Sequence, residues 1–160
     1  MSSSVNVKTP LGIAIITGDE NGIQRISITD DEQTDIPSAK IPDCLKKATI
    51  QLQEYFEGER TDFDLILNPI GTDFQKKVWN ELLKIPFAKT ASYLDIAKRL
   101  GDPKCIRAAA SANGKNPLWI VIPCHRVIGT DGSLTGYAGG LWRKKWLLDH
   151  ETPSPQQSLF

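Results

Sequence analysis

A cysteine, a histidine and an arginine stand side by side at Cys124, His125 and Arg126, directly after Pro123. A neighbouring imidazole or guanidinium favours the thiolate form of cysteine, which is the nucleophilic form. Because proline fixes its own backbone angle and donates no hydrogen bond, we expect the chain to leave the core at Cys124. An isolated Cys-His pair is more often a small buried cysteine beside a surface histidine. The pair alone therefore leaves both a structural and a nucleophilic role open.

The residues around this pair form a longer motif, which runs from Asn116 to Gly129 and reads NPLWIVIPCHRVIG. Its apolar part, 118–122, is short, rich in β-branched residues and bounded by two prolines, which predicts a buried strand. The motif resembles the active-site signature of the O6-alkylguanine-DNA alkyltransferases, the methylated-DNA-protein-cysteine methyltransferases. The resemblance is close over 71–151 and looser over the first seventy residues.

This resemblance implies DNA repair by direct reversal of alkylation. The alkyl group would pass from O6 of guanine, or less readily O4 of thymine, to Cys124 after the nucleotide is flipped out of double-stranded DNA. His125 would be the base, and Glu151 the carboxylate that orients it. Asn116 and Arg126 would hold the backbone of the site. Since a thioether offers water no leaving group, each molecule would react once, and no cofactor would be needed.

The geometry of the site follows from two further expectations. Adjacent residues of an extended chain face opposite ways, so we expect His125 to act on Cys124 through a water unless the chain turns there. The glycine-rich stretch 130–140 is too polar for the core, and by resemblance it forms the wall of the guanine pocket. The residues expected to line that pocket are Tyr137, Gly136, Ala138, Gly139, Pro123 and Ile122.

Short helices with clear start signals precede the motif. A capping-box pair at 72–75 predicts one helix, and Ser92 as N-cap with Asp95 three residues on predicts a second. Asp102 followed by Pro103 predicts a third that ends near 113. The second and third helices are joined by a glycine-containing turn, which is typical of a helix-turn-helix.

The third helix is built mostly of alanine and serine, so few long side chains keep its backbone away from a neighbour. These small residues favour either tight packing inside the domain or close approach to DNA. By resemblance the helix enters the minor groove, where an arginine replaces the flipped nucleotide and a tyrosine helps to turn it out. The residues expected to contact DNA are Arg107 and Tyr93 in those two roles, with Ala108, Ser111, Asn113 and Lys104.

The first half of the chain reads as a support for the second. Strand patterns occur at 5–8, 11–17 and 23–28, and Glu-Asn-Gly at 20–22 predicts a hairpin between the last two. An acidic loop at 30–40 precedes a helix that opens at Pro42 and ends before Gly58, and a further short strand is expected at 63–67. We therefore expect a mixed α/β (α+β) fold.

Three segments are predicted along the chain. Residues 1–69 would form a small antiparallel sheet with a helix, and 70–151 a mostly helical, winged-helix-like domain for DNA binding and alkyl transfer. The last helix of that domain, 141–150, carries apolar residues expected to be mostly core: Trp142, Trp146, Leu147 and Leu148. Two prolines and polar residues predict that 152–160 is a flexible tail.

Composition narrows the class of protein. Charged residues make up 24% of the chain and hydrophobic ones 40%, without the long apolar run of a membrane span or the features of a signal peptide. Three cysteines at scattered spacing favour a reducing cytoplasm, and with two histidines they make a zinc site unexpected. The net charge of zero is the sum of a net charge of minus six over 1–69 and of plus six over 70–160. The basic second half is therefore suited to bind a polyanion.

Two features depart from a simple alkyltransferase pattern. Ala88 stands in the turn 85–90 where the family usually has glycine, which affects the local backbone and not the chemistry. The tail ends in Gln156, Gln157, Ser158, Leu159 and Phe160, which resembles the peptide by which bacterial repair and replication proteins bind the sliding clamp. Docking of Leu159 and Phe160 on the protein's own surface is the alternative.

Two other functions were weighed for a protein expected to be monomeric. A non-catalytic protein that binds alkylated DNA would share the helices and the arginine, but that group has tryptophan where this chain has Cys124. A cysteine hydrolase would use the same residue types without DNA and would turn over an ester or amide.

Overall fold

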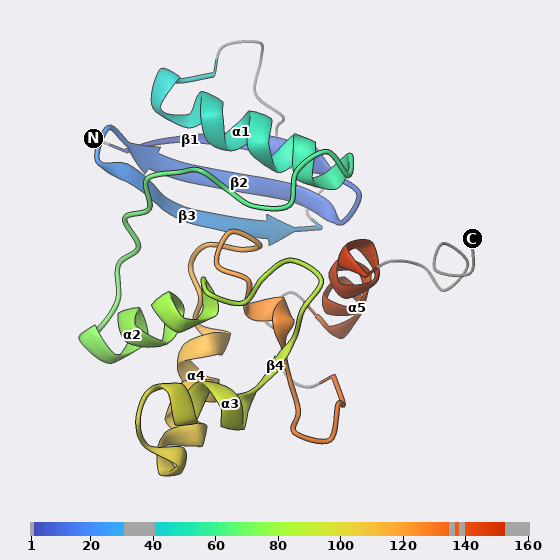
Figure 1. Ribbon diagram of the computed structural model, residues 1–160. Coiled ribbons are helices and arrows are strands. Elements are labelled where there is room, and N and C mark those ends of the chain that lie inside the picture. Colours follow the sequence, from blue (N-terminus) through green and yellow to red (C-terminus); the bar gives the residue numbers. More distant parts are fainter. Residues whose placement is uncertain (1, 31–40, 135–136, 138–139, 153–160) are drawn as a thin grey trace. The chain divides into compact units, whose positions relative to one another are not determined.

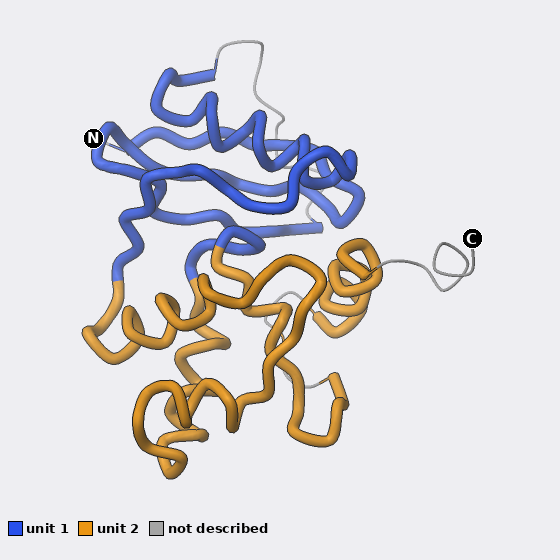
Figure 2. The backbone as a smooth tube through the Cα atoms, in the orientation of Figure 1, with its two compact units in different colours: residues 1–70, 117–121 blue, residues 71–116, 122–160 orange. Residues whose placement is uncertain are grey.

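The computed structural model describes residues 2–30, 41–134, 137 and 140–152, and the chain forms two compact units (Figures 1 and 2). Unit 1 comprises residues 1–70 and 117–121, and unit 2 comprises 71–116 and 122–160. The sequence-based boundary near residue 70 therefore needs one correction. The apolar run that precedes Cys124 belongs to unit 1, because its backbone pairs with a strand of that unit.

Unit 1 is built on a three-stranded antiparallel sheet of β1 (Ser3–Thr9), β2 (Gly12–Asp19) and β3 (Gly22–Thr29), in that order. The predicted hairpin between β2 and β3 is present, and Asp19 pairs with Gly22 at its turn. Gly22 has a φ of 136°, and a side chain there would meet the carbonyl oxygen of Ile66 at 2.8 Å. Only glycine fits this position.

Helix α1 (Asp43–Phe56) covers one face of this sheet (Figure 1). Leu45, Leu52 and Tyr55 recur at helical spacing and are fully buried there. The strand predicted at 63–67 is reduced to one bridge, between Leu67 and Ile23. The predicted loop at 31–40 lies outside the described residues.

The apolar run 118–122 is not the strand that its composition predicts. Leu118 forms a single parallel bridge with Ile26 of β3, and the amide of Trp119 donates to the carbonyl of Ile26. The chain then turns sharply, since Ile120 has a φ of 70° and the Val121 amide bonds the Trp119 carbonyl at 2.8 Å. This is a γ-turn, a strained conformation for a β-branched residue. An apolar run predicts that its side chains are buried, and the side chains of a turn can be buried as well as those of a strand.

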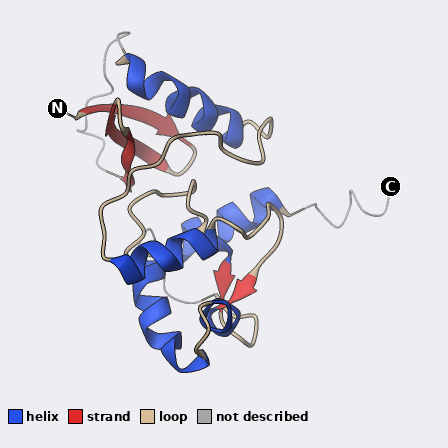
Figure 3. Ribbon diagram, turned by 60° about the vertical axis from the view of Figure 1, so that its left-hand side comes forward, coloured by secondary structure: helices blue, strands red, loops and turns tan. Residues whose placement is uncertain are grey.

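Unit 2 is mostly helical, and its first helices begin at the predicted caps. Capping boxes precede α2 (Asp73–Leu82) and α3 (Tyr93–Arg99). The third predicted helix starts as a 3-10 turn, η1 (Pro103–Cys105), and continues as α4 (Ile106–Gly114). Strands β4 (Ala91–Ser92) and β5 (Val127–Ile128) pair in parallel among these helices (Figure 3).

The last helix, α5 (Leu141–Glu151), differs from the prediction in what it buries. Leu147 is buried as expected, whereas the Trp142 side chain is 54% exposed and stacks on the guanidinium of Arg143. The buried face of α5 is partly charged, because Arg143, Lys144 and Glu151 lie on it. Among the helices of the described residues, none is long and apolar enough to cross a membrane.

Candidate active site

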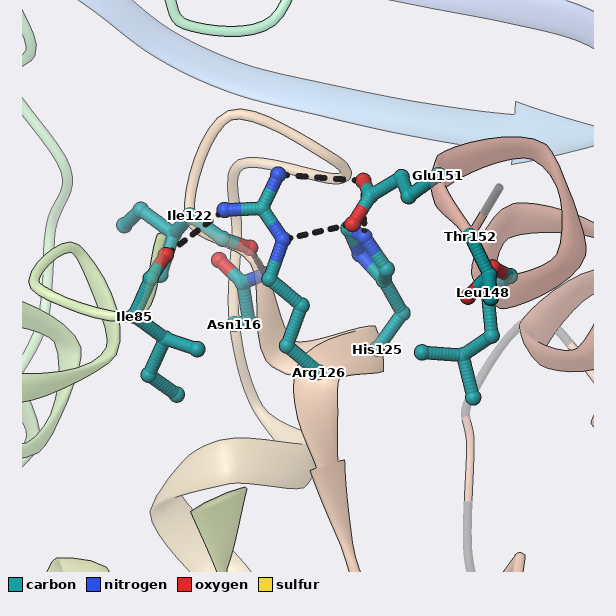
Figure 4. A network of polar contacts seen from close by, with 8 residues as sticks. All are labelled: Ile85, Asn116, Ile122, His125, Arg126, Leu148, Glu151 and Thr152. Atoms are coloured by element: carbon teal, nitrogen blue, oxygen red, sulfur yellow. Dashed lines mark hydrogen bonds and ion pairs between the residues drawn. The ribbon is translucent and has the colours of Figure 1, made fainter. Parts of the chain in front are cut away.

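Cys124 is presented by a second tight turn. Pro123 has a φ of −81° and a ψ of 63°, and the Cys124 amide donates to the Ile122 carbonyl at 2.8 Å, which is an inverse γ-turn. The same carbonyl accepts a 2.7 Å bond from Nδ2 of Asn116, seen in Figure 4. Asn116 thus bonds the backbone two residues before the cysteine. The thiol itself is buried.

The chain turns again at the Cys-His pair, which is the exception that the expectation of transfer through a water allowed. Residues Cys124–Arg126 form the 3-10 helix η2, which carries the side chains of His125 and Arg126 into the interior of unit 2. Pro123 stands at the N-cap of this turn, where its missing N–H costs no hydrogen bond of the turn.

His125 and Arg126 both meet the carboxylate of Glu151, the last residue of α5 (Figure 4). Nε2 of His125 lies 2.7 Å from Oε2 of Glu151. Arg126 donates from Nε to Oε1 at 2.7 Å and from Nη2 to Oε2 at 3.0 Å, and from Nη1 to the carbonyl of Ile85 at 2.7 Å. The Glu151 side chain is 1% exposed, so water competes little for these bonds.

These contacts set the protonation of His125. Burial alone would raise the pKa of Glu151, but hydrogen bonds from His125 and Arg126 outweigh it and lower that pKa to about 2. Burial also lowers the pKa of His125, against the pull of Glu151. A charged Glu151 can only accept, so Nε2 of a neutral His125 carries the proton. Nδ1 then bears the free lone pair, and it is buried without a hydrogen-bond partner among the described residues.

Cys124 needs a base in this surrounding. Burial raises the pKa of its thiol, while contacts from Asn116, Lys144 and Tyr137 oppose that rise. The thiol is therefore protonated at neutral pH, and a reaction at its sulfur would need a base to take the proton.

Lys144 is a site residue that sequence reasoning missed. Its side chain is fully buried on α5, burial lowers its pKa, and its Nζ lies 5.9 Å from the ring centre of Tyr93. A signal was available, because Lys144 precedes Glu151 by seven residues and so lies on the same helical face.

The small residues of α4, the helix predicted to contact DNA, lie partly in the interior and partly at the surface. Ala109 and Ala112 face the interior, where the Ala112 carbonyl accepts a 2.9 Å bond from Nε1 of Trp79. The other face is open to solvent, with these predicted contact residues exposed on it or just before it: Arg107, Ala108, Ser111 and Lys104. Tyr93 is half-buried. Asn113 is 3% exposed, so its predicted contact with DNA is wrong, since it lies on the packed face of α4.

The predicted pocket is described in part. Pro123 and Ile122 are buried beside the cysteine, and Tyr137 has a buried hydroxyl that acts on the thiol. Gly136, Ala138 and Gly139 lie outside the described residues, as does the tail from 153 onwards. No group of three or more metal-ligating side chains occurs in the part of the chain that the structure describes.

Unit 2 thus holds a buried cysteine next to a buried histidine, together with the short helices α3 and α4, which suits a protein that combines cysteine chemistry with DNA binding. The family model described as "6-O-methylguanine DNA methyltransferase, DNA binding domain" matches residues 73–153. The model of the ribonuclease-like domain of the same methyltransferase matches residues 6–69. The chain belongs to the 6-O-methylguanine DNA methyltransferase family.

Similar proteins span nearly the whole chain. Methylated-DNA--protein-cysteine methyltransferases are 43% identical in Methanosarcina acetivorans, over 90% of this chain and 94% of that protein, and 44% identical in Bacillus subtilis, over 94% and 96%. The crystal structure of the Mycobacterium tuberculosis O6-methylguanine methyltransferase aligns over 100% of both chains at 40% identity, with a TM-score of 0.82. The Mycobacterium tuberculosis protein in complex with DNA aligns at 43% identity over 92% of each chain, also with a TM-score of 0.82.

Proposed function

We propose that this protein repairs DNA by moving an alkyl group from O6 of guanine to its own Cys124. The relatives are named as methylated-DNA--protein-cysteine methyltransferases over most of the chain. The observation that carries the assignment to Cys124 is the buried His125–Glu151 contact of 2.7 Å, which leaves Nδ1 of His125 as the free base. Similarity identifies the family, and this contact supports the choice of nucleophile.

The reaction is a direct displacement. His125 takes the proton of the Cys124 thiol, the sulfur attacks the alkyl carbon, and the bond from that carbon to O6 breaks. Its electron pair leaves on guanine, which then takes the proton. The thioether that forms is stable to water, so one molecule repairs one lesion. The two alternatives differ in the number of reactions per molecule: a non-catalytic lesion binder transfers no group, and a cysteine hydrolase reacts repeatedly.

DNA binding falls to the exposed face of α4 and its approach. Arg107 and Lys104 are exposed there beside the small residues Ala108 and Ser111, which suits close approach to a minor groove. Arg107 fills the place of the flipped nucleotide, and Tyr93 helps to turn it out. Residues 122–152 then receive the base, with Tyr137 against it.

The test is the intact mass of the protein after incubation with an oligonucleotide that contains O6-methylguanine. We expect a stoichiometric gain of one methylene on the peptide of Cys124 and none after Cys124→Ser. Cys44 and Cys105 are less buried thiols of the same chain and supply the controls, since Cys44→Ser and Cys105→Ser keep the transfer. Repeated turnover, or modification of either control cysteine, contradicts the mechanism. Turnover of an ester or amide by the wild type favours a hydrolase.

We also propose a partner for the last residues of the chain, from their sequence. Gln156, Ser158, Leu159 and Phe160 fit the peptide that binds bacterial sliding clamps, and the related proteins include bacterial ones. A DNA-repair protein gains from such a contact because the clamp keeps it on DNA. We also propose that the protein is a monomer and that it works in a reducing cytoplasm. The three free cysteines support the second of these proposals.

Calorimetry with the clamp of the source organism tests this proposal. We expect micromolar-range binding that deletion of Leu159 and Phe160 abolishes while transfer to Cys124 is kept. Gln157→Leu is the matched gain-of-function control, because leucine is usual at that position of the clamp peptide. Absence of binding, or a loss of stability on deletion, favours docking of Leu159 and Phe160 on the protein itself.

A further inference from the structure

Arg126 and His125 share one carboxylate inside unit 2. Oε2 of Glu151 lies 2.7 Å from Nε2 of His125 and 3.0 Å from Nη2 of Arg126, while Oε1 lies 2.7 Å from Nε of Arg126 (Figure 4). The side chains of His125, Arg126 and Glu151 are 0%, 8% and 1% exposed. Charges in this cluster therefore act on one another with little screening by solvent.

The charge of the cluster depends on the proton of His125. With a neutral imidazole, the negative charge of Glu151 and the positive charge of Arg126 cancel. With an imidazolium the cluster carries one positive charge in a dry interior, which is costly. Without Arg126 the preference is reversed, because the carboxylate of Glu151 would then be balanced only by an imidazolium.

We propose that Arg126 is a positioning residue for the proton transfer, which holds the Glu151 carboxylate in a bidentate ion pair so that His125 rests neutral and with Nδ1 vacant. This inference rests on the proposed function of Cys124 and His125, and it adds a role to a residue that sequence reasoning treated as structural. Arg126 acts on His125 through the carboxylate of Glu151 and through its own positive charge.

This role of Arg126 also favours movement of the thiol proton from Cys124 through His125 to the departing guanine. When the S–H bond of Cys124 breaks, its proton passes to Nδ1 of His125, and the new S–C bond replaces the C–O6 bond of the substrate. The thioether is neutral, so the cluster of His125, Arg126 and Glu151 is left with one positive charge in excess. The departing guanine carries the electron pair of the broken bond, and the proton moves on to it. Arg126 thereby disfavours a lasting imidazolium and favours release of neutral guanine.

The other charges near His125 point the same way. Lys144 reaches it from α5, the helix that also carries Glu151, and its positive charge adds to the effect of Arg126. In the described part of the chain the charged groups that act on His125 are Glu151, Arg126 and Lys144, and the titratable thiol of Cys124 adjoins it. Glu151 is thus the anion whose effect Arg126 must offset.

The experiment is a pH profile of single-turnover alkyl transfer from free O6-benzylguanine, a substrate that needs no DNA binding. In Arg126→Gln we expect the acidic limb of the profile to move to higher pH by about one unit or more, the usual effect of an uncompensated neighbouring charge. The ¹⁵N signals of the His125 ring should show the same shift in its protonation. An acidic limb that stays in place while the rate falls equally at every pH overturns the proposal.

Two variants distinguish the effect of the positive charge of Arg126 from the effect of its hydrogen bonds. Arg126→Lys keeps the positive charge but loses the fork and the bond to Ile85, so we expect a slower reaction with the acidic limb near its wild-type position. Arg143→Gln removes another buried cation of unit 2, 6% exposed, and should leave the limb unmoved. A limb that moves equally in Arg126→Lys and Arg126→Gln contradicts the charge argument.

A third variant keeps the test usable if Arg126→Gln does not fold. Glu151→Gln removes the anion and leaves Arg126 in place, so the acidic limb should move to lower pH, and an unmoved limb again overturns the proposal. Failure of the proposed function looks different, since wild-type protein would then show no transfer to Cys124 at any pH.

Discussion

Replacing Ala88 with glycine should stabilise the protein, although glycine usually destabilises. Ala88 has a φ of 68° at the third position of a turn closed by the 3.1 Å bond from the Lys89 amide to the Pro86 carbonyl. This is where a type II turn requires positive φ. An L-residue pays about 1–2 kcal/mol for that conformation, whereas glycine loses about 0.5–1 kcal/mol in extra chain entropy. The expected net gain is about 0.5 kcal/mol.

A second glycine substitution makes this small gain measurable. Ala110 lies within α4, where Ala110→Gly should cost about 1 kcal/mol. The two variants carry the same chemical change, so their free energies of unfolding should differ by about 1.5 kcal/mol, with opposite signs relative to wild type. Urea denaturation measures both, and transfer from free O6-benzylguanine reports whether the site is intact. If Ala88→Gly is as destabilising as Ala110→Gly, the argument from strain is refuted.

Three further predictions concern other parts of the chain. Gly71→Ala should destabilise unit 2 by about 1–3 kcal/mol and change Trp79 fluorescence, because an added Cβ would lie 2.4 Å from the Trp79 ring; wild-type stability would contradict this. The free energy of unfolding should fall as pH falls from 4.5 towards 2, because the pKa of Glu151 is lowered from 4.5 to about 2 on folding, and Glu151→Gln should lose stability less steeply over that range. Arg107→Ala should slow repair in duplex DNA far more than reaction with the free base, because only the duplex requires flipping, at about a few kcal/mol; equal losses would give Arg107 a structural role.

The sequence predicted the elements whose signals are local. Ser92 caps α3, and the Glu-Asn-Gly turn joins β2 and β3, because capping and turn preferences act within a few residues. The fate of 118–122 could not be read in this way. Its apolar side chains predict burial, but the partner that makes it a turn and not a strand is the distant backbone of Ile26.

The candidate site was predicted unevenly for a similar reason. Asn116 and Glu151 follow from the resemblance; in the structure Asn116 donates to the Ile122 carbonyl and Glu151 contacts His125, and their roles stay predictions. Asn113 and Lys144 are polar residues that composition places at the surface, but both side chains are buried. Helical phase decides both, because a shift of one residue in the assumed phase turns a side chain by about 100° around the helix axis. The use of Arg126 depends on a contact with Glu151 that no local pattern contains.

The passage of residues 117–121 through unit 1 bears on how the protein is made. A ribosome that has synthesised the three strands and α1 has not yet supplied the segment that pairs with Ile26. Unit 1 is therefore completed only when all of α2, α3 and α4 have also left the exit tunnel. Ile122, Pro123 and Cys124 follow the residues that complete it, so the nascent chain finishes its first unit and acquires its nucleophile in the same few steps of elongation.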